Sequence, residues 1–343
     1  MGEEIPMRSE NLNRLGVGKI PIGVLDSTVL RFTGAESKLL ATPPKAGLDF
    51  AAIRLGRNFM VISADPITGV VSEIGRYAVA VSANDVATSG NRPQFLESVV
   101  LLPAGSTTRD VAYIARQIHI AAKDIGVTIV GGHTEVTPGL SRPIVITTAF
   151  SFVRRYVSSD GARAGDTLMM TKTAGLEGTA ALARELGPPN GSISSGVAKR
   201  AKLFLDRISV VDEAEAAFET GRVNAMHDCT EGGVLGAAYE MSLASGVGFE
   251  LDEAAVPVAP ETKAMCKHLS LDPMKLIGSG SLLIATKKGS EKLLQKALNG
   301  ICGVSPIGRF TNKERVLLKT DGSETRISSA PEDELWRALR GRE

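Results

Sequence analysis

Apolar and polar positions alternate along the chain in two patterns, and these predict its strands and helices. Short apolar runs indicate strands, whereas apolar residues three or four apart indicate the buried face of a helix. The predicted strands are 22–25, 46–53 (entered through a turn), 59–63, 94–102, 127–130, 144–152, 166–170, 223–226, 282–285 and 304–307. The predicted helices are 1–20, 74–89, 108–125, 173–186, 197–205, 212–220, 232–243, 291–298 and 331–342, with a surface loop at 187–192.

The predicted helix 74–89 brings a polar pair into an apolar setting. Its buried face follows the i, i+3, i+4, i+7 spacing of Ile74, Tyr77, Ala78 and Val81. Asp85 continues that face, with Asn84 at its edge, and Gly90 and Pro93 end the helix. Burying a carboxylate costs free energy unless the group is paired, hydrogen-bonded or bound to a metal. Asp85 is therefore either a cap for a neighbouring loop or a ligand.

A second candidate site lies between the strands 127–130 and 144–152. Gly131 and Gly132 begin a predicted loop that continues with His133, Thr134 and Glu135. Glycines let backbone N–H groups approach a ligand closely, so this loop is a candidate binding site. The alternative is a wide turn without a ligand.

The second half of the chain carries its own motif. Asp228 ends a short strand, Thr230 follows it, and Gly232 and Gly233 begin a helix. A carboxylate before a glycine-rich helix start suits a metal ion and a phosphate, although Asp228 could instead cap the helix. Near the N-terminus, Lys19 follows a flexible glycine turn and either reaches a phosphate or belongs to a solvated loop.

Composition narrows the possible functions. At 343 residues the chain is long enough for two domains, which we place at 1–157 and 158–343, with the junction near 158–163. The 36 glycines and 4% aromatic residues favour an α/β protein, and the net charge of +1 does not indicate nucleic-acid binding. Three widely spaced cysteines indicate neither zinc nor disulfides, which fits a reducing cytoplasm. Neither a signal peptide nor a membrane span is expected.

Four aspartates stand at predicted strand ends, turns or the inward helix face: Asp49, Asp65, Asp85 and Asp228. No Walker A sequence and no GxGxxG after a strand is present, so neither a P-loop nor a Rossmann site is expected. Mg²⁺ is usually shared between one or two carboxylates and phosphate oxygens. The set therefore indicates Mg²⁺-nucleotide binding by a less common route.

The chain also resembles the family of aminoimidazole ribonucleotide (AIR) synthetase, which includes selenophosphate synthetase, thiamine-monophosphate kinase and HypE. HypE-like members are the most similar, by the Asn-Asp segment at 84–85 and the DxTxGG motif at 228–233. The resemblance extends from Gly47 to about Ile307. Six segments in the family order carry it: GLDFAA (47–52), SADP (63–66), GRYAVAVSANDVATSGNRP (75–93), GVTIVGGHTEVTPG (126–139), MHDCTEGGVLGAAYE (226–240) and GSGSLLIA (278–285).

The resemblance implies two domains, α/β and α+β, of the PurM-like type. The N-terminal sheet would pair with a second subunit's sheet to form a shared barrel, and ATP and Mg²⁺ would lie between the domains of this homodimer. Metal or phosphate contacts are implied for the aspartates: Asp49, Asp65, Asp85 and Asp228. Nucleotide contacts are implied for Asn84, Gly131, Gly132 and Thr134. The further candidates for nucleotide binding come from the residue pattern itself: Lys19, Thr230, Gly232 and Gly233.

Three departures from the family pattern qualify this expectation. Many members have two adjacent acids where this chain has Leu48-Asp49-Phe50. His133 stands where several relatives have an acid, and Glu135 could compensate for it. The chain ends at Glu343 without the terminal cysteine on which HypE carries its carbamoyl group, and no cysteine precedes Cys229. Cyanide-precursor synthesis by the HypE route is therefore not expected.

We therefore expect a cytoplasmic, homodimeric enzyme that uses Mg²⁺-ATP to phosphorylate or activate an oxygen of a small molecule. His133 or Glu135 would serve in acid–base catalysis. The alternative is an accessory or regulatory protein that binds nucleotide without efficient turnover, with a maturation protein as a possible partner. A second alternative is thiamine-monophosphate kinase activity.

Overall fold

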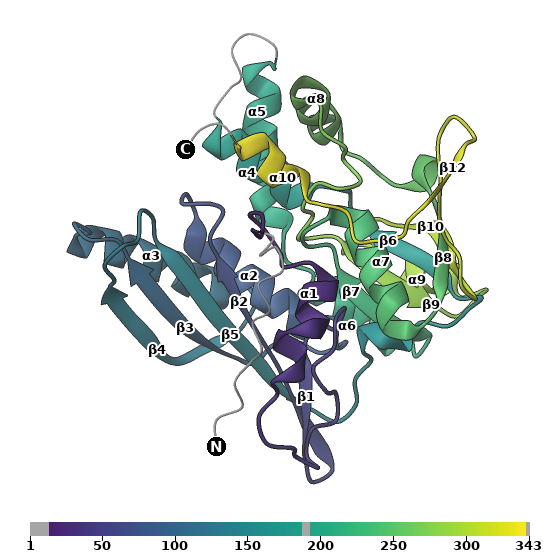
Figure 1. Ribbon diagram of the computed structural model, residues 1–343, viewed down its shortest axis with the longest axis horizontal. Helices are drawn as coiled ribbons and strands as arrows, with labels where there is room; N and C mark the ends of the chain where they lie inside the picture. Colours follow the sequence, from purple (N-terminus) through teal and green to yellow (C-terminus); the bar gives the residue numbers. More distant parts are fainter. Residues whose placement is uncertain (1–13, 187–192, 341–343) are drawn as a thin grey trace.

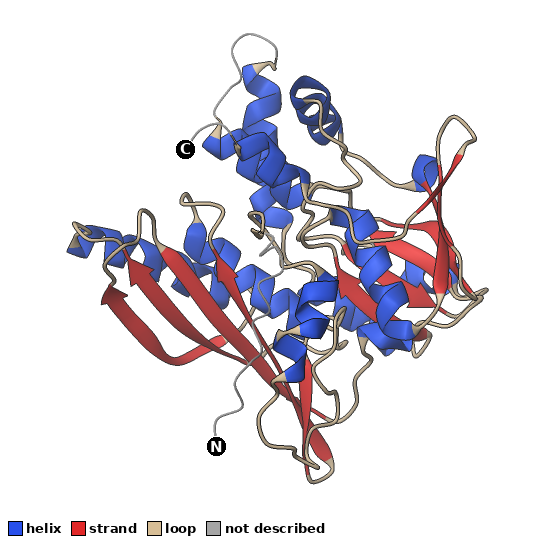
Figure 2. Ribbon diagram, viewed as in Figure 1, coloured by secondary structure: helices blue, strands red, loops and turns tan. Residues whose placement is uncertain are grey.

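The structure, a computed structural model, describes residues 14–186 and 193–340, and contains two sheets with helices packed around them (Figures 1 and 2). The strands are β1 (Ala51–Leu55), β2 (Asn58–Ile67), β3 (Phe95–Leu102), β4 (Thr128–Val136), β5 (Ile144–Val153), β6 (Thr167–Thr171), β7 (Val223–Asp228), β8 (Gly248–Asp252), β9 (Leu282–Thr286), β10 (Val304–Thr311), β11 (Arg315–Leu318) and β12 (Glu324–Arg326). The α-helices are α1 (Ile22–Ser27), α2 (Ile74–Ala87), α3 (Thr108–Asp124), α4 (Leu176–Glu185), α5 (Ser195–Lys202), α6 (Val211–Glu219), α7 (Gly233–Ser245), α8 (Pro260–Leu269), α9 (Glu291–Ala297) and α10 (Glu334–Leu339). The 3-10 helices are η1 (Val29–Arg31), η2 (Ser159–Gly161), η3 (Leu203–Arg207) and η4 (Glu253–Ala255).

The first sheet has the strand order β1-β2-β5-β3-β4, and all its neighbours are antiparallel except the pair β3–β4. Helices α2 and α3 pack on one face, where apolar side chains of β2, β3 and β5 join their core. The opposite face carries the mutually contacting rings of Phe95, Phe150 and Phe152, of which Phe152 is 47% exposed. This face and the edge strand β4 are therefore open in the described chain.

The second sheet has the order β12-β11-β8-β10-β6-β9-β7. Residues of α7 share a core with one face of this sheet, and residues of α6 and α9 share a core with the other. This arrangement gives the C-terminal half the layered α+β architecture that was predicted. Among the described residues, none of the helices is both long enough and apolar enough to cross a bilayer.

Helix α2 lies between the two domains and is buried on nearly every side. Of its 14 residues all but Arg76 are buried, and Ala83 and Ala87 belong to the core that includes α6 and β7. The predicted helix is confirmed, but the prediction of a single buried face was wrong because both sheets pack against α2. Gly90 follows with φ +84°, and a Cβ there would lie 2.2 Å from the ring of Phe218. The predicted glycine cap thus also permits close packing between the domains.

Several local predictions were wrong. Residues 22–25 form part of helix α1, whose first turn is closed by the Val24 and Leu25 amides donating to the Pro21 carbonyl. The glycine loop expected at 131–135 lies within strand β4. The elements β8, α8, β11 and β12 were not predicted. Most of the predicted helix 1–20, the loop 187–192 and the end of the helix 331–342 lie outside the described residues.

Candidate functional site

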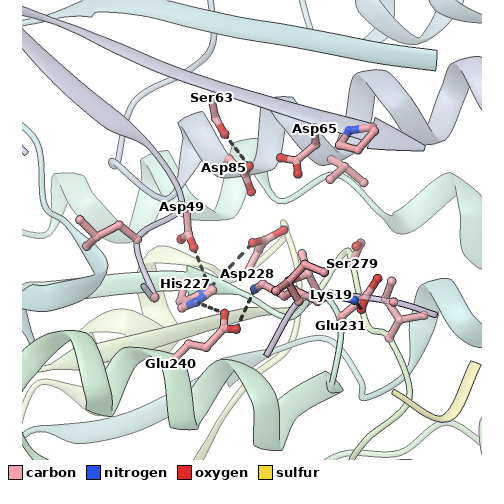
Figure 3. A pocket seen from close by; sticks show the side chains of 18 of the residues that line it. Lys19, Asp49, Ser63, Asp65, Asp85, His227, Asp228, Glu231, Glu240 and Ser279 are labelled. Atoms are coloured by element: carbon pink, nitrogen blue, oxygen red, sulfur yellow. Dashed lines mark hydrogen bonds and ion pairs between the residues drawn. The ribbon is translucent and has the colours of Figure 1, made fainter. Parts of the chain in front are cut away.

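A cavity of about 670 Å³ lies between the domains, with residues of β2 and α2 on one side and of β7 and α7 on the other (Figure 3). Its lining is strongly acidic: seven carboxylates face two lysines, Lys19 and Lys45, and one histidine. The seven carboxylates are Asp49, Asp65, Asp85, Glu177, Asp228, Glu231 and Glu240.

The N-terminal domain brings three of these carboxylates together. Asp49 precedes β1, whereas Ser63 and Asp65 lie two residues apart on β2 and so point to the same face of the sheet. That face meets Asp85 of α2, and Ser63 Oγ donates a hydrogen bond of 2.7 Å to Asp85 Oδ2. Burial raises the pKa of Asp85 well above its usual range, and the neighbouring Asp65 raises it further.

Asp228 supplies the opposing carboxylate from the end of β7. Its side chain is 1% exposed, and neither of its oxygens has a hydrogen-bond partner within the described chain. Burial raises the pKa of Asp228 well above its usual range, with Asp49 contributing further. Ligand atoms of Asp49, His227 and Asp228 all lie within 4.8 Å of one another. Two unpartnered, buried carboxylate oxygens fit a hard cation, since Mg²⁺ prefers oxygen ligands.

His227 lies between two carboxylates behind this group. Its Nδ1 is 3.0 Å from Asp49 Oδ1, and its Nε2 is 3.2 Å from Glu240 Oε2. Burial alone would lower the pKa of His227, but Asp49 and Glu240 raise it to about 10. Each ring nitrogen of His227 faces a carboxylate, so the imidazolium holds the side chains of Asp49 and Glu240 in place. Neither ring nitrogen is then left to contact a ligand.

Lys19 completes the array from the N-terminal segment. Its Nζ lies 2.7 Å from Glu240 Oε1, and its backbone N–H donates to Glu231 Oε2 at 2.7 Å. Burial would raise the pKa of Glu240, but Lys19 and His227 lower it to about 2. Lys19 therefore lies at the cavity, as a phosphate-contacting residue would, with its ammonium paired to Glu240.

The structure thus brings six of the predicted residues to one cavity: Lys19, Asp49, Asp65, Asp85, Asp228 and Thr230. Asn84 has another position. Its Nδ2 donates to the Ile208 carbonyl at 2.8 Å, and its Oδ1 accepts from the Val210 amide at 2.9 Å. Asn84 therefore joins α2 to the C-terminal domain and is not among the residues that line the cavity, and its nucleotide contact stays a prediction.

Gly232 and Gly233 are also absent from the cavity lining. The Gly232 amide donates to Asp333 Oδ2 at 2.7 Å, and the Gly233 amide donates to the Thr230 carbonyl at 3.0 Å. A Cβ on Gly233 would lie 2.7 Å from the Leu276 carbonyl oxygen. These glycines therefore allow a packed turn with φ above zero, and both amides donate within the protein, so their phosphate contacts stay a prediction.

The residues of β4 lie away from the cavity in this chain. Strand β4 is the third strand from β2, about 14 Å away at the usual strand spacing, and all its residues are exposed. His133 Nε2 is 3.0 Å from Glu135 Oε2 in a solvent-exposed pair. A single chain therefore does not bring these residues to the cavity. This applies to the predicted nucleotide contacts of Gly131, Gly132 and Thr134 and to the predicted acid–base roles of His133 and Glu135.

The glycines of β4 have a structural explanation. The β3–β4 pairing shifts register between Leu96 and Glu97, and a Cβ on Gly132 would lie 1.9 Å from the Ser98 carbonyl oxygen. A glycine within a strand often marks such an irregularity or a close approach of two backbones. The sequence pattern that suggested a ligand loop is instead explained by the close backbone approach in this pairing.

Sequence reasoning missed eight polar residues of the cavity: Lys45, Ser63, Thr68, Glu177, His227, Glu231, Glu240 and Ser279. His227 and Glu240 lie inside the segment 226–240 that carries the family resemblance, and a buried histidine beside Asp228 was a usable signal. Ser279 lies inside the family segment 278–285, whereas Glu177 lies outside all six segments that carry the resemblance. Only the tertiary structure brings them together.

Comparison with known proteins agrees with this architecture. The model of the AIR synthase related protein, N-terminal domain, matches residues 47–153, and the model of the C-terminal domain matches residues 163–320. Carbamoyl dehydratase HypE of Cupriavidus necator is 33% identical over 242 residues, which cover 69% of this chain and 65% of that protein.

Two solved structures share the fold. The structure of a HypE-HypF complex aligns with a TM-score of 0.73 at 23% identity, covering 89% of this chain and 99% of that chain. A structure of the hydrogenase maturation protein HypE in complex with ATP aligns with a TM-score of 0.70 at 21% identity, covering 92% of this chain and 93% of that chain.

Proposed function

Since this chain belongs to the AIR synthase-related family, we propose that it binds Mg²⁺-ATP in the cavity between its domains and transfers the γ-phosphoryl group to an oxygen of a small molecule. The choice of ATP as the nucleotide is supported by the structure of the hydrogenase maturation protein HypE in complex with ATP. The volume of about 670 Å³ is in the range of ligand sites. Transfer to that oxygen either yields the product or activates the oxygen for displacement.

The observation that carries the proposal is the buried carboxylate of Asp228, which has no hydrogen-bond partner in the described chain and whose charged neighbour, His227 Nδ1, is 3.9 Å away. A buried polar group without a partner costs free energy, so its presence calls for an explanation such as a bound ion. Asp49, Asp65 and Asp85 converge on the same space from the other domain. We infer that these four aspartates hold Mg²⁺, which would supply positive charge to the phosphates of the nucleotide.

The charge of the cavity supports the same conclusion. Seven carboxylates would repel a triphosphate, and Lys19 is already paired with Glu240. Lys45 Nζ donates to the Ala244 carbonyl at the edge of the cavity. Acidic sites bind polyphosphates through divalent cations, which neutralise the charge between the carboxylates and the phosphates. We therefore expect nucleotide binding to require Mg²⁺.

A homodimer is part of the proposal. The open face with Phe95, Phe150 and Phe152 lies next to the unpaired edge of β4. Exposed edges and apolar faces of this kind are usually covered in native proteins. Pairing with a second copy would cover both features and would place His133 and Glu135 at the subunit interface.

The alternative is a HypE-like accessory protein that binds nucleotide without efficient turnover. Its support is that the predicted acid–base pair His133–Glu135 lies outside the cavity of the single chain. A maturation protein as partner is supported by the HypE-HypF complex among the structural neighbours.

Calorimetric titration tests the proposal. We expect ATP to bind to the wild-type protein when Mg²⁺ is present and to lose most of its affinity in excess EDTA. A measurement of ADP release would then distinguish the two alternatives, because the enzyme releases ADP and the accessory protein binds ATP without efficient turnover. Absence of binding at millimolar Mg²⁺-ATP would refute the proposal.

A further inference from the structure

Glu177 is a buried carboxylate of the cavity that the proposed metal site does not use. It lies in the first turn of α4, is 6% exposed and lines the cavity. Its Oε2 is buried and has no hydrogen-bond partner in the part of the chain that the structure describes. A partnerless carboxylate oxygen at a cavity wall is available to a ligand that donates a hydrogen bond.

Glu177 and the proposed metal site interact with residues on different turns of α2. Tyr77 of α2 interacts electrostatically with Glu177, whereas Asp85 lies eight residues further along the same helix. Val81, between them on that face, also lines the cavity. Eight residues of helix span about 12 Å. This separation leaves room for a triphosphate with its metal at the aspartates and an acceptor at Glu177.

The surroundings of Glu177 suit a group that exchanges protons near neutral pH. Burial raises the pKa of Glu177, contact with Ser279 offsets part of this rise, and Asp333 and Glu231 raise it again, to about 7. Tyr77 of α2 also interacts electrostatically with Glu177, and burial raises the pKa of Tyr77 far above the neutral range. A general base is most effective when its pKa lies near the working pH.

On the premise of the proposed function, we propose that Glu177 is the general base for an uncharged acceptor that carries a proton on its nucleophilic oxygen, such as an alcohol. The acceptor proton moves to the Glu177 carboxylate while the acceptor oxygen bonds to the γ-phosphorus. The bond from the γ-phosphorus to the β–γ bridging oxygen breaks, and its electron pair leaves with ADP.

The same geometry disfavours an anionic acceptor. A phosphate monoester or carboxylate has no proton to remove at neutral pH, so it would not need Glu177. It would also be repelled by Glu231 and Asp333, which both lie close enough to raise the pKa of Glu177. The proposed acceptor class is therefore chemically distinct from that of an enzyme that phosphorylates a phosphate.

Two measurements on Glu177→Gln test this, with Glu185→Gln at the exposed end of the same helix as the control. The first is Mg²⁺-ATP hydrolysis from pH 5.5 to 9, with water as the acceptor, alongside calorimetric Mg²⁺-ATP affinity. The second is infrared titration of protonated carboxyl groups in the nucleotide-free protein. The second measurement needs no turnover.

We expect wild-type hydrolysis to rise with pH to a plateau above about 7, and Glu177→Gln to lose this inflection and about 100-fold in rate. Its Mg²⁺-ATP affinity should change by about twofold at most, because binding does not use Glu177. Since the pKa of Asp333 is also raised to about 7, one of two carboxyl signals that titrate near pH 7 should disappear in Glu177→Gln and in no control. Retained rate and inflection in this variant, or retention of both carboxyl signals, would overturn the inference. If the wild type does not hydrolyse ATP, the infrared signal of Glu177 alone decides whether the inference stands. Failure of the wild type to bind Mg²⁺-ATP would refute the proposed function, which is a separate outcome.

Discussion

His227 Nδ1 lies 3.0 Å from Asp49 Oδ1, and this contact joins the last turn of chain before β1 to the end of β7. The histidine comes from the C-terminal domain and the aspartate from the N-terminal domain. Because Glu240 approaches the other ring nitrogen at 3.2 Å, one imidazolium holds two buried carboxylates. The position of Asp49 in the candidate metal site thus depends on His227.

His227→Ala should therefore destabilise the protein strongly. The substitution leaves Asp49 and Glu240 buried without their shared cation, and removing one partner of a buried ion pair typically costs about 3–5 kcal/mol. Urea unfolding measures this loss. His119→Ala on the exposed side of α3 is the control and should lie within about 0.5 kcal/mol of the wild type. Similar stabilities for the two variants would mean that the contact is not structural.

Asn84→Ala should reduce stability without weakening nucleotide binding. The variant leaves the Ile208 carbonyl and the Val210 amide without partners, at about 1–3 kcal/mol for each buried group. Urea unfolding and Mg²⁺-ATP calorimetry of the same preparation separate the two effects. Asn58→Ala, at the exposed start of β2, is the matched control. A loss of affinity at unchanged stability would support the nucleotide contact predicted from the sequence.

Gly131 and Gly132 should respond differently to alanine. A Cβ on Gly132 would lie 1.9 Å from the Ser98 carbonyl oxygen, whereas the nearest atom to a Cβ on Gly131 is 3.9 Å away. We expect Gly132→Ala to lose about 2 kcal/mol or more, since β3 and β4 must separate. Gly131→Ala should change stability little. Thermal unfolding of both variants decides, and equal midpoints would contradict the pairing described.

The buried Glu177 predicts a dependence of stability on pH. Its pKa is raised in the folded protein to about 7 from an ordinary value of 4.5, so the unfolded chain ionises first as pH rises. Its favourable contribution is complete below pH 4.5 and is lost as pH rises through 7. Between pH 5 and 8, Glu177→Gln should gain about 2–3 kcal/mol relative to the wild type. A stability difference independent of pH, measured by urea unfolding, would contradict this.

The sequence allowed the prediction of those parts of the structure whose signals are local. The apolar run 59–63 and the apolar spacing along α3 depend on nearest neighbours, and both elements are confirmed. Residues 22–25 have a strand-like composition, but Pro21 begins a helical turn there. The roles of Gly132 and Asn84 are set by Ser98, Ile208 and Val210, which are distant in sequence or on another strand. Local patterns do not contain these contacts.

The same distinction applies to the candidate site. Aspartates next to strands or in the central helix could be identified one by one, and the structure brings Asp49, Asp65, Asp85 and Asp228 to one cavity. Glu177 could not be identified in this way, because its chemistry depends on burial against Ser279 and Asp333. The environment of a side chain decides whether a carboxylate is a solvated charge or a reactive group.

Calorimetric titration of Mg²⁺-ATP into Asp228→Asn tests the central claim most directly, with Asp206→Asn, at a half-exposed side chain, as the control. If the unpartnered Asp228 carboxylate holds the metal, the variant should lose about 10-fold or more in affinity. It should stay folded, because it keeps the shape of the side chain and removes a carboxylate that has no hydrogen-bond partner in the described chain and only a 3.9 Å contact with His227 Nδ1. Unchanged affinity in a folded Asp228→Asn variant would contradict the account.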